Sequence, residues 1–561
     1  MNEPSSPAAP SVQRDALHFL PLGGAGEIGM NLNLYACQGQ WLMVDLGITF
    51  AGDTLPGIDV LMPDPAFIEE RRKDLLAIVL THAHEDHLGA VAYLWPRLRC
   101  PVYATPFAAA VLREKLADAK LLSEVPLTEV ALSGRLDLGP FALTFISLTH
   151  SIPEPNALLI ETPYGRVMHT GDWKIDPDPL VGDPLDEAAL RQAGEAGVLA
   201  LVGDSTNATV EGESGSEGQV RETLTRLIAE REQGIAVTLF ASNVARLESV
   251  AMAARDAGRE PVLVGRSLHR YVRAARACGY LEGVRLLTED EGAPLHSSQV
   301  VYLCTGCQGE PRAAMSRIGS DNHPRVSLGD GDTVIFSSKI IPGNERTIGD
   351  LHNRLLRRGI EVITENDAGV HVSGHPCQGE LRQMYQWIRP QIAVPVHGEA
   401  RHMQAHGALA RALQVPEPVF VENGDLLRLA PGPATVIGRA PAGRLALDGE
   451  QIVATDHVSI GARRKLMHNG AVFVSVVVDR SGRTLVSPQV SGRGILDGED
   501  EQETREAIAA DVADAVDSLP RAQAREESAI EQAVRQAIRR ALRESHGKRP
   551  VIDVQIARVP G

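Results

Sequence analysis

The chain has 561 residues, 43% of them hydrophobic and 23% charged, which is the composition of an ordinary globular protein of about two to four domains. No apolar run approaches the roughly 20 residues that a membrane-spanning helix needs, and the formal net charge of −17 argues against a protein that coats nucleic acid non-specifically. An enzyme with a positive cleft is not excluded, because a substrate responds to the local field and two divalent ions would add about four positive charges.

The start of the chain and its cysteines give expectations about the cellular compartment. Residues 1–14 predict a flexible tail, because 1–10 are rich in Pro, Ser and Ala and lack the basic start and apolar core of a signal peptide. Six cysteines in a chain of this length do not indicate a disulfide framework. We therefore expect free thiols, a cytoplasmic location and no membrane partner.

Short apolar strands alternate with turns and a few helices over residues 15–210, which predicts α/β layering. The strands expected there include 41–44, 75–80 and 142–146. Residues 211–365 change to a βαβ pattern, which predicts a second, open-sheet domain. Its expected elements include a helix over 218–235 and strands over 236–240, 262–265 and 333–336.

The strand–turn pattern returns over 366–428 and is followed by a Pro-, Gly- and Ala-rich stretch, so that 429–461 is predicted to be a linker. Residues 462–561 predict a small α+β domain with strands over 471–478 and 551–556. Two helices are expected between them from apolar residues at helical spacing, namely Ile508, Val512, Val516 and Leu519, then Ile530, Val534, Ile538 and Leu542.

The most informative motif is His82-Ala83-His84-Glu85-Asp86-His87, which directly follows the predicted strand 75–80. Four such side chains cannot share one face of a helix or strand, but a loop at a strand end can turn them toward one point. Imidazole and carboxylate groups are ligands of zinc and similar ions, and this cluster is enough to begin two adjacent metal sites. A single loop histidine would indicate only a polar surface, whereas three with an aspartate in six positions indicate metal binding.

Three further metal-competent residues are expected where a strand meets a loop. His150 follows the predicted strand 142–146, Asp172 follows the short apolar run 166–168, and His397 follows another run over 392–396. These positions make all three candidates for completing the metal centre.

The order His-x-His-x-Asp-His, His, Gly-Asp and a late His resembles the ligand order of the metallo-β-lactamase fold. This resemblance implies an α/β protein built on an αβ/βα sandwich, with two divalent metal ions at one edge. It further implies that one metal is held by His82, His84 and His150, that the other is held by Asp86, His87 and His397, and that Asp172 bridges both. Zinc suits these ligands, while Mn²⁺ or Mg²⁺ as the activating ion stays an alternative.

Residue 397 lies 225 positions after residue 172, which leaves room for an inserted domain and matches the composition change at 211–365. Such an insertion before the last histidine resembles the β-CASP nucleases, whose motifs match Asp204, His375 and His397. Over nearly its whole length the chain is similar to the bacterial ribonuclease J family. The supporting segments are 22–31, 171–174, 240–243, 304–310 and 337–345.

That resemblance implies a ribonuclease with 5′-to-3′ exonuclease activity on 5′-monophosphorylated single-stranded RNA and with endonuclease activity, in rRNA and mRNA processing and decay. A homodimer or homotetramer through the C-terminal domain, and helicases as partners in RNA decay, are also implied. In the catalytic step two metals would activate water and stabilise the transition state, with Asp86 among the catalytic residues. His375, oriented by Asp204, is the implied general acid, although a role in phosphate binding alone stays open.

Grip on the RNA is expected from donors near the cleft. The compact loop of His371, Val372, Ser373, Gly374 and His375 suits one phosphate, and Ser242 with Asn243 suits another. Weaker candidates are Ser337, Ser338 and Lys339. Arg266, Arg270 and Arg273 recur at helical spacing and indicate either a basic face or an ordinary solvated helix.

Other functions stay open at this point. A related nuclease acting on DNA is one, since no residue that reads the ribose 2′-hydroxyl can be picked out. A small-molecule hydrolase of lactam or thioester type is disfavoured by the large insertion, which a small substrate does not need. A metal-free scaffold is disfavoured because every expected ligand is present, and a redox di-iron protein would want a carboxylate in place of His84.

Overall fold

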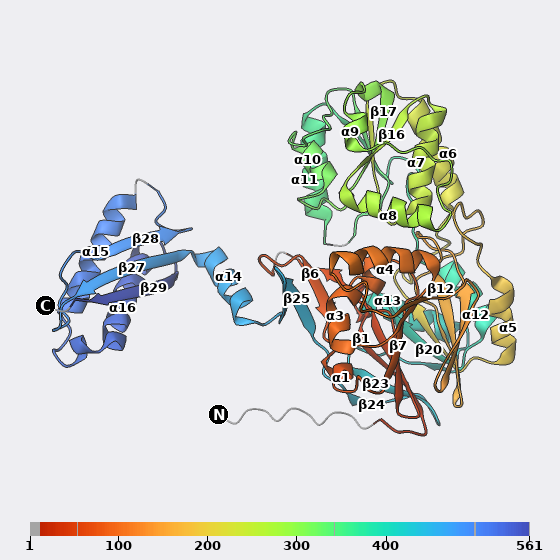
Figure 1. Ribbon diagram of the computed structural model, residues 1–561, viewed down its shortest axis with the longest axis horizontal. Coiled ribbons are helices and arrows are strands. Elements are labelled where there is room, and N and C mark those ends of the chain that lie inside the picture. Colours follow the sequence, from red (N-terminus) through yellow and green to blue (C-terminus); the bar gives the residue numbers. More distant parts are fainter. Residues whose placement is uncertain (1–11, 53, 342, 499–500, 560–561) are drawn as a thin grey trace. The chain divides into compact units, whose positions relative to one another are not determined.

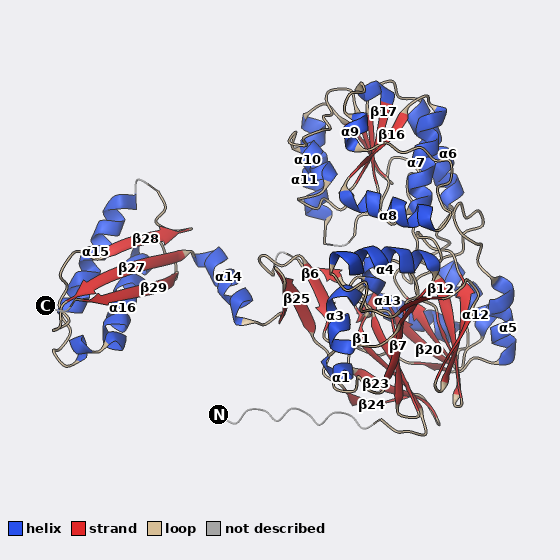
Figure 2. Ribbon diagram, viewed as in Figure 1, coloured by secondary structure: helices blue, strands red, loops and turns tan. Residues whose placement is uncertain are grey.

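The computed structural model describes residues 12–52, 54–341, 343–498 and 501–559, so the tail expected over 1–14 lies almost wholly outside the described residues. The chain forms two compact units, Met1–Phe50 with Leu61–Arg444, and Ala51–Val60 with Leu445–Gly561. Both are mixed α/β structures (Figures 1 and 2). Among the described helices, none has the length and apolar character needed to cross a bilayer.

Two β-sheets face each other in the larger unit. The first has the order β24-β23-β1-β3-β4-β7-β8-β9 and the second has the order β10-β11-β12-β13-β14-β20-β22. The strands of the first are β1 (Leu17–Gly23), β3 (Leu32–Cys37), β4 (Gln40–Val44), β7 (Leu75–Val79), β8 (Val102–Ala104), β9 (Leu127–Glu129), β23 (Asp425–Ala430) and β24 (Thr435–Arg439). Those of the second are β10 (Arg135–Leu138), β11 (Phe141–Ser147), β12 (Asn156–Thr162), β13 (Gly165–His169), β14 (Ala200–Asp204), β20 (Ile392–Val396) and β22 (Glu417–Pro418).

The inner faces of these sheets form one core, because alternate residues of each strand point the same way and are apolar. Phe19, Tyr35 and Val44 of the first sheet pack in this core with Phe145 and Val202 of the second. Helices pack on the outer faces, and a second core joins Leu190, Trp387 and Leu409 to the outer side of the second sheet. The result is an αβ/βα sandwich, as the resemblance to the metallo-β-lactamase fold implies.

The helices of the sandwich are α1 (Ala66–Glu69), α2 (Glu85–Leu88), α3 (Val91–Leu98), α4 (Pro106–Asp118), α5 (Glu187–Ala196), α12 (Gln378–Ile388) and α13 (Ala400–Ala412). Short strands complete this region: β2 (Ala25–Gly26), β5 (Thr49–Phe50), β6 (Val60–Pro63) and β21 (Gly398–Glu399).

A five-stranded parallel sheet of order β16-β17-β15-β18-β19 lies between β14 and β20 in the chain. Its strands are β15 (Ile235–Thr238), β16 (Glu260–Val264), β17 (Val300–Cys304), β18 (Thr333–Phe336) and β19 (Glu361–Ile363). Its helices are α6 (Glu217–Ala229), α7 (Val244–Asp256), α8 (Arg266–Ala277), α9 (Glu289–Gly292), η1 (Ser297–Gln299), α10 (Ala314–Gly319) and α11 (Glu345–Arg357). This is the inserted open-sheet domain, although α6 ends earlier than the expected residue 235.

A buried ion pair ties the first two helices of the inserted domain together. Arg246 is fully buried and donates to both carboxylate oxygens of Glu217, at 2.7 and 2.9 Å. Its remaining nitrogen donates to the Ser337 side chain at 2.7 Å and to the Val370 carbonyl at 3.1 Å. The guanidinium thus has its full set of partners in a dry environment, which is the condition under which a buried charge is tolerated.

Glu217→Ala should therefore lower the free energy of unfolding by about 3–5 kcal/mol, because it leaves the buried Arg246 charge without its partner. The measurement is urea denaturation followed by circular dichroism. The matched control is Glu230→Ala, which breaks an exposed pair with Arg226 and should cost about 0–1 kcal/mol. Equal losses in the two variants would contradict the assignment of Arg246 to a sealed network.

The segment 429–461, predicted to be a linker, contains three short strands, and the two compact units divide within it, between Arg444 and Leu445. Strand β24 pairs antiparallel with β23 and extends the first sheet. Strands β25 (Arg444–Asp448) and β26 (Gln451–Ala454) form a hairpin around Gly449, whose φ is +64°. The Pro and Gly residues mark turns between short strands here, and β-branched Thr435 and Val436 favour the extended chain.

The C-terminal residues form a three-stranded sheet of order β28-β27-β29 with helices on one face. Its elements are α14 (Val458–Asn469), β27 (Ala471–Val478), β28 (Gln489–Arg493), α15 (Gln502–Asp517), η3 (Gln523–Arg525), α16 (Glu527–Ser545) and β29 (Val551–Arg558). The predicted strands and both apolar helix stripes are confirmed, since Val512 and Ile538 pack on Val474 in one core.

Candidate metal centre

The candidate metal ligands come from strand ends on both sheets. His82 to His87 follow β7, and His150 lies three residues beyond β11. Asp172, Asp204 and His397 lie at or just beyond the carboxyl ends of β13, β14 and β20. These three strands are parallel neighbours in one sheet, so their carboxyl ends meet at the same edge.

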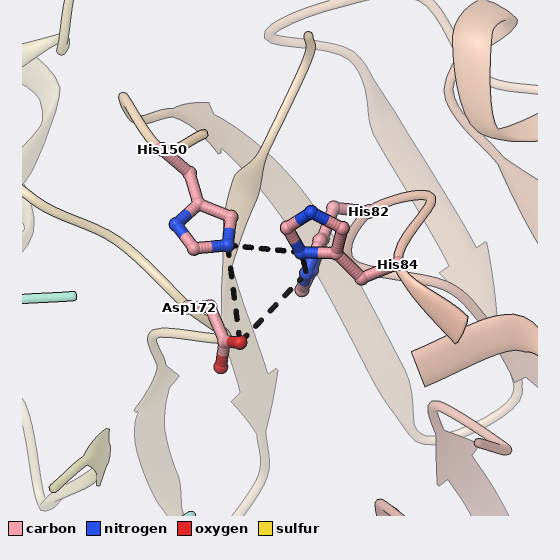
Figure 3. A group of neighbouring side chains, drawn as sticks. All are labelled: His82, His84, His150 and Asp172. Carbon is pink, nitrogen blue, oxygen red and sulfur yellow. Dashed lines mark hydrogen bonds and ion pairs between the residues drawn. The ribbon is translucent and has the colours of Figure 1, made fainter. Parts of the chain in front are cut away.

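The first group of ligand atoms is shown in Figure 3. His84 Nδ1 lies 3.1 Å from His82 Nε2 and 3.0 Å from His150 Nε2. Asp172 Oδ2 lies 3.8 Å from His82 Nε2 and 4.0 Å from His150 Nε2. Three imidazoles and a carboxylate therefore point their donor atoms at one spot.

The second group meets the first at Asp172. His87 Nε2 lies 3.1 Å from Asp172 Oδ2 and 3.6 Å from Asp86 Oδ2, and His397 Nε2 lies 3.1 Å from the same Asp86 oxygen. A third overlapping group joins Asp172, Asp204, His375 and His397. The seven residues expected as metal ligands are thus brought together in the predicted arrangement, with Asp172 common to both sets.

The chemistry of the donors fits divalent metal ions. Nitrogen and oxygen donors in two sets of four match the coordination number of zinc, and within each set the ligand atoms lie within 4.8 Å of one another. Asp172 is 2% exposed, and its Oδ1 atom is buried without a hydrogen-bond partner. A buried carboxylate oxygen without a hydrogen-bond partner destabilises the fold unless a cation binds it.

Four of the candidate ligand histidines are held through their second ring nitrogen, as is usual for metal-binding imidazoles. Thr81 Oγ1 lies 3.0 Å from His82 Nδ1, and Asp45 Oδ2 lies 2.7 Å from His87 Nδ1. Thr206 Oγ1 lies 2.9 Å from His397 Nδ1. The fourth is His150, whose Nδ1 donates to the Gly374 carbonyl at 2.5 Å.

Asp45, Thr81 and Thr206 are supporting residues that the sequence reasoning missed. Asp45 directly follows β4 and is fully buried, so it has the same strand-end signal that identified Asp172. It accepts from both the backbone and the hydroxyl of Thr81 at 2.8 Å, which fixes it toward His87. No comparable signal marks the two threonines in the sequence.

Close backbone packing also shapes the centre. A Cβ at Gly47 would lie 1.7 Å from the Asp86 carbonyl oxygen, and one at Gly374 would lie 2.7 Å from the His150 ring. His397 has φ of +50°, a left-handed conformation that is strained for a residue with a side chain. These positions show that the ligand geometry is set by the surrounding backbone.

The electrostatics divide the histidines into two classes. Burial lowers the pKa of His82 and His150 well below the usual value and that of His84 to about 4, so these rings are neutral, as metal ligation requires. Burial also opposes the charge on His397, but Asp172, Asp86 and Asp204 outweigh it and raise its pKa to about 10.

The carboxylates of the centre stay ionised. Burial disfavours the charged form of Asp172, but His397 and His87 outweigh it and lower its pKa to about 2. The same balance puts the pKa of Asp86 well below its ordinary value, with His87 as the leading favourable partner. The ionised Asp172 and Asp86 carboxylates favour binding of cations, and a bound cation would replace the protons on the neighbouring histidine rings.

His375 and Asp204 form a pair beside the second group. His375 Nδ1 lies 2.8 Å from Asp204 Oδ2, and the His375 side chain is 23% exposed while that of Asp204 is buried. Burial acts against protonation of His375, but Asp204 outweighs it and raises the pKa of the ring. The pair therefore favours the protonated form of an imidazole that is partly exposed to solvent.

The loop from His371 to His375 lies against this pair. Ser373 Oγ accepts from Asn207 Nδ2 at 2.7 Å and from the His375 backbone at 3.1 Å. His371 Nδ1 is buried without a partner, and burial together with the charges of Arg246 and Lys339 lowers the pKa of this ring to about 3. Val372 and Gly374 complete the loop, which joins the centre through the His150 contact.

The other expected phosphate contacts have structural partners of their own. Asn243 is 5% exposed and caps α7 by accepting from the Arg246 backbone at 2.9 Å, while Ser242 beside it is half-buried. Ser337 is buried and binds Arg246, Ser338 is also buried, and the Lys339 side chain is exposed. The structure thus brings Lys339 and Ser242 to partly open positions and commits the side chains of Asn243 and Ser337 elsewhere.

Comparison with known proteins gives matches along most of the chain. Models of the metallo-beta-lactamase superfamily and of the Zn-dependent metallo-hydrolase RNA specificity domain match residues 19–213 and 359–421. Between and after them, models of the ribonuclease J beta-CASP domain and of the ribonuclease J C-terminal domain match residues 232–355 and 458–559.

Curated relatives and a solved structure agree with these matches. A ribonuclease J of Sinorhizobium meliloti is 50% identical over 553 residues, which cover 98% of each chain. A ribonuclease J of Thermus thermophilus is 35% identical over 83% of each chain. A crystal structure of an Enterococcus faecalis protein of unknown function shares the fold, with a TM-score of 0.51 at 16% identity over 74% of this chain and all of that one.

Four observations agree on one family assignment. They are the sandwich, the insertion between β14 and β20, the clustered histidines and aspartates, and the full-length sequence similarity. The chain belongs to the ribonuclease J family of metallo-β-lactamase and β-CASP hydrolases.

Proposed function

We propose that the protein is a two-metal ribonuclease that degrades 5′-monophosphorylated single-stranded RNA from the 5′ end and also cuts internally, in the processing and decay of rRNA and mRNA. The observation that carries the proposal is the pair of ligand groups sharing Asp172, with His375 and Asp204 beside them. The similarity to proteins named ribonuclease J supports RNA as the substrate.

One metal would be held by His82, His84 and His150, the other by Asp86, His87 and His397, with Asp172 between them. Zn²⁺ suits these donors, and Mn²⁺ or Mg²⁺ is the alternative as the activating ion. When bound, two such ions supply an activated water and neutralise charge on the phosphate in the transition state.

The proton for the leaving ribose 3′-oxygen would come from His375. Its Nδ1 faces Asp204 at 2.8 Å, so the proton there is committed to the carboxylate and Nε2 is free to donate to substrate. Asp204 holds the ring in orientation and keeps its pKa raised, which favours the acid form at neutral pH.

RNA would be held by the loop 371–375 and by the positive groups around it. His371 has an unpartnered ring nitrogen, and burial together with Arg246, Lys339 and Lys174 lowers its pKa. Arg246 is paired with Glu217 and Lys174 with Asp176, so the exposed Lys339 is the proposed positive contact for the RNA. Backbone and side-chain donors of Ser373 and Gly374 suit a single phosphate, and Ser242 is the proposed second contact. A phosphate pocket at a fixed distance from the metals would favour 5′-monophosphate ends and release of single nucleotides.

The test is to incubate the protein with matched RNA and DNA strands, 5′-monophosphorylated and 3′-labelled, with Zn²⁺, Mn²⁺ or Mg²⁺. Stepwise shortening of RNA from its 5′ end, lost in the Asp86→Ala, His87→Ala variant, is the expected result. Preferential cutting of DNA would move the protein to the second candidate, a DNA nuclease. Hydrolysis of neither strand would overturn the proposal.

A second copy of the chain is proposed to cover the open face of the C-terminal sheet. Helices bury one face through Val472, Val474 and Val476, but Phe473 points away from them and is 44% exposed. It is the only Phe, Tyr or Trp in residues 445–561, and large aromatic side chains gain most when an interface buries them.

Phe473→Ser should weaken self-association by at least about tenfold in Kd, because about 1.5–3 kcal/mol of apolar burial is lost. Analytical ultracentrifugation over a concentration series measures this change. Val436→Ser in the larger unit, which alters a side chain of similar exposure (41%), is the control. Identical association of wild type and Phe473→Ser would contradict the proposed interface.

Cytoplasmic helicases of RNA decay are the further partners that we propose on the strength of the family alone.

A further inference from the structure

Helix α8 of the inserted domain packs on helix α4 of the sandwich (Figure 1). Arg273 donates two hydrogen bonds to Glu114, at 3.0 and 2.6 Å, and Arg270 lies 2.6 Å from Asp118. The expected basic face of α8 is therefore partly used in contacts with α4, whose Lys115 in turn lies 2.7 Å from Glu85, the first residue of α2 and the neighbour of His84. A continuous set of contacts thus leads from α8 to that loop.

Tyr271 of α8 reaches the loop directly. Its side chain is 5% exposed, and its hydroxyl donates to the Ala83 carbonyl at 3.3 Å. Ala83 stands between the ligands His82 and His84, in a stretch that belongs to neither β7 nor α2. Because no strand or helix holds this carbonyl, the tyrosine supplies the support that regular secondary structure does not.

Tyr280, just beyond the end of α8, reaches the other ligand-bearing loop. Its hydroxyl donates to Glu154 Oε1 at 3.0 Å, and the second carboxylate oxygen accepts from the Phe107 backbone at 2.7 Å. Glu154 is 7% exposed, has φ of +58° and lies in the loop that carries His150. The Phe107 ring packs against both tyrosine rings, at centroid distances of 6.5 and 6.1 Å.

We propose that Tyr271 and Tyr280 are positioning residues that couple the docking of the inserted domain to metal binding by His82, His84 and His150. These histidines come from two loops, and a single segment of the inserted domain holds both loops. Because such coupling is reciprocal, metal binding stabilises α8 in its docked position by the same factor by which docking tightens the metal site. This inference rests on the proposed function only in treating the histidines as metal ligands.

The first test measures release of Zn²⁺ from the loaded full-length protein into a fluorescent chelator, without RNA. Tyr271→Phe and Tyr280→Phe each remove one hydroxyl and should speed release of one of the two ions by roughly 5- to 10-fold, near the lower end of effects seen for residues that support metal ligands. The double variant should release it faster still. Tyr302→Phe, at a buried tyrosine in the sheet of the inserted domain, is the control and should match the wild type.

The second test follows hydrogen exchange of the α8 amides with and without Zn²⁺. Removal of the ion should speed exchange in the wild type and have little effect in the double variant, because the coupling has been cut. The inference would be overturned if both tyrosine variants released Zn²⁺ at the wild-type rate. It would also be overturned if the exchange rate of the α8 amides in the wild type were the same with and without Zn²⁺. A lower melting temperature with unchanged Zn²⁺ release would do the same, since it indicates a purely structural role.

These outcomes are separable from failure of the proposed function. A wild-type protein that binds two ions but cuts no RNA would overturn the ribonuclease proposal and leave the coupling measurable. A wild-type protein that binds no ion at these histidines would overturn both.

Discussion

Asp172→Asn is expected to abolish RNA hydrolysis, lowering the rate by at least about 10³-fold, or roughly 4 kcal/mol of transition-state stabilisation. Asp172 Oδ2 lies 3.1 Å from His87 Nε2 and within 4.0 Å of the ring nitrogens of His82 and His150, so it belongs to both ligand groups. An amide keeps the shape of the side chain but removes the charge that both cations need. The metal content of the purified variant should therefore fall from two ions per chain to one or none.

Metal content by atomic emission and hydrolysis of a labelled RNA are the two measurements. Asp183→Asn changes an exposed aspartate eleven positions downstream and should retain two ions and full activity. An Asp172→Asn protein that keeps both ions and cuts RNA at the wild-type rate would refute the bridging role.

His375→Ala should lower kcat by about 10²–10⁴-fold while leaving both metals bound, which is the size of effect expected for a general acid. His375 Nε2 is turned away from Asp204, so the alanine removes the proton donor without removing a ligand of the two proposed metal sets. Combining it with Asp204→Asn should cost little more than either change alone, because residues that act as one unit are not additive.

An RNA whose scissile 3′-oxygen is replaced by sulfur separates acid catalysis from phosphate binding. A thiolate leaves without protonation, so His375→Ala should recover most of its lost rate on this substrate. If the variant is equally slow on both RNAs, or its defect lies in KM alone, His375 binds phosphate instead of donating a proton.

The parts of the centre that sequence reasoning found share one physical property. Candidate metal ligands in this fold are polar, cluster in sequence and follow strands whose ends meet, so His82 to His87, Asp172 and His397 stand out against their apolar neighbours. The sequence gives no signal for Thr81, because a hydroxyl residue near a histidine is common in sequences. Thr206 cannot be identified either, because only the fold brings it to His397, 191 positions away. Tyr271 is hidden for the same reason, 188 positions from Ala83.

Two differences between the sequence reasoning and the structure also have physical causes. Residues 429–461 resemble a linker because they contain a Pro-, Gly- and Ala-rich stretch, but short strands between turns need only a few β-branched residues when a sheet edge is available for pairing. Asn243 is predicted to contact a phosphate because it follows a strand, and in the structure it is also the N-cap of α7, where its side chain accepts from the backbone of the helix. Local chemistry alone does not decide between these two uses.

The insertion between β14 and β20 has a consequence for synthesis of the chain. Strand β20 pairs with β14, and β23 pairs with β1. Both β14 and β1 therefore lack a pairing partner along one edge until residues beyond 390 have been synthesised. Until the ribosome has delivered those residues, the apolar strands β14 and β1 each expose an unpaired edge, which invites pairing with other nascent chains. The inserted domain has its own core and can fold during this interval, which brings the two ends of the gap together before β20 arrives.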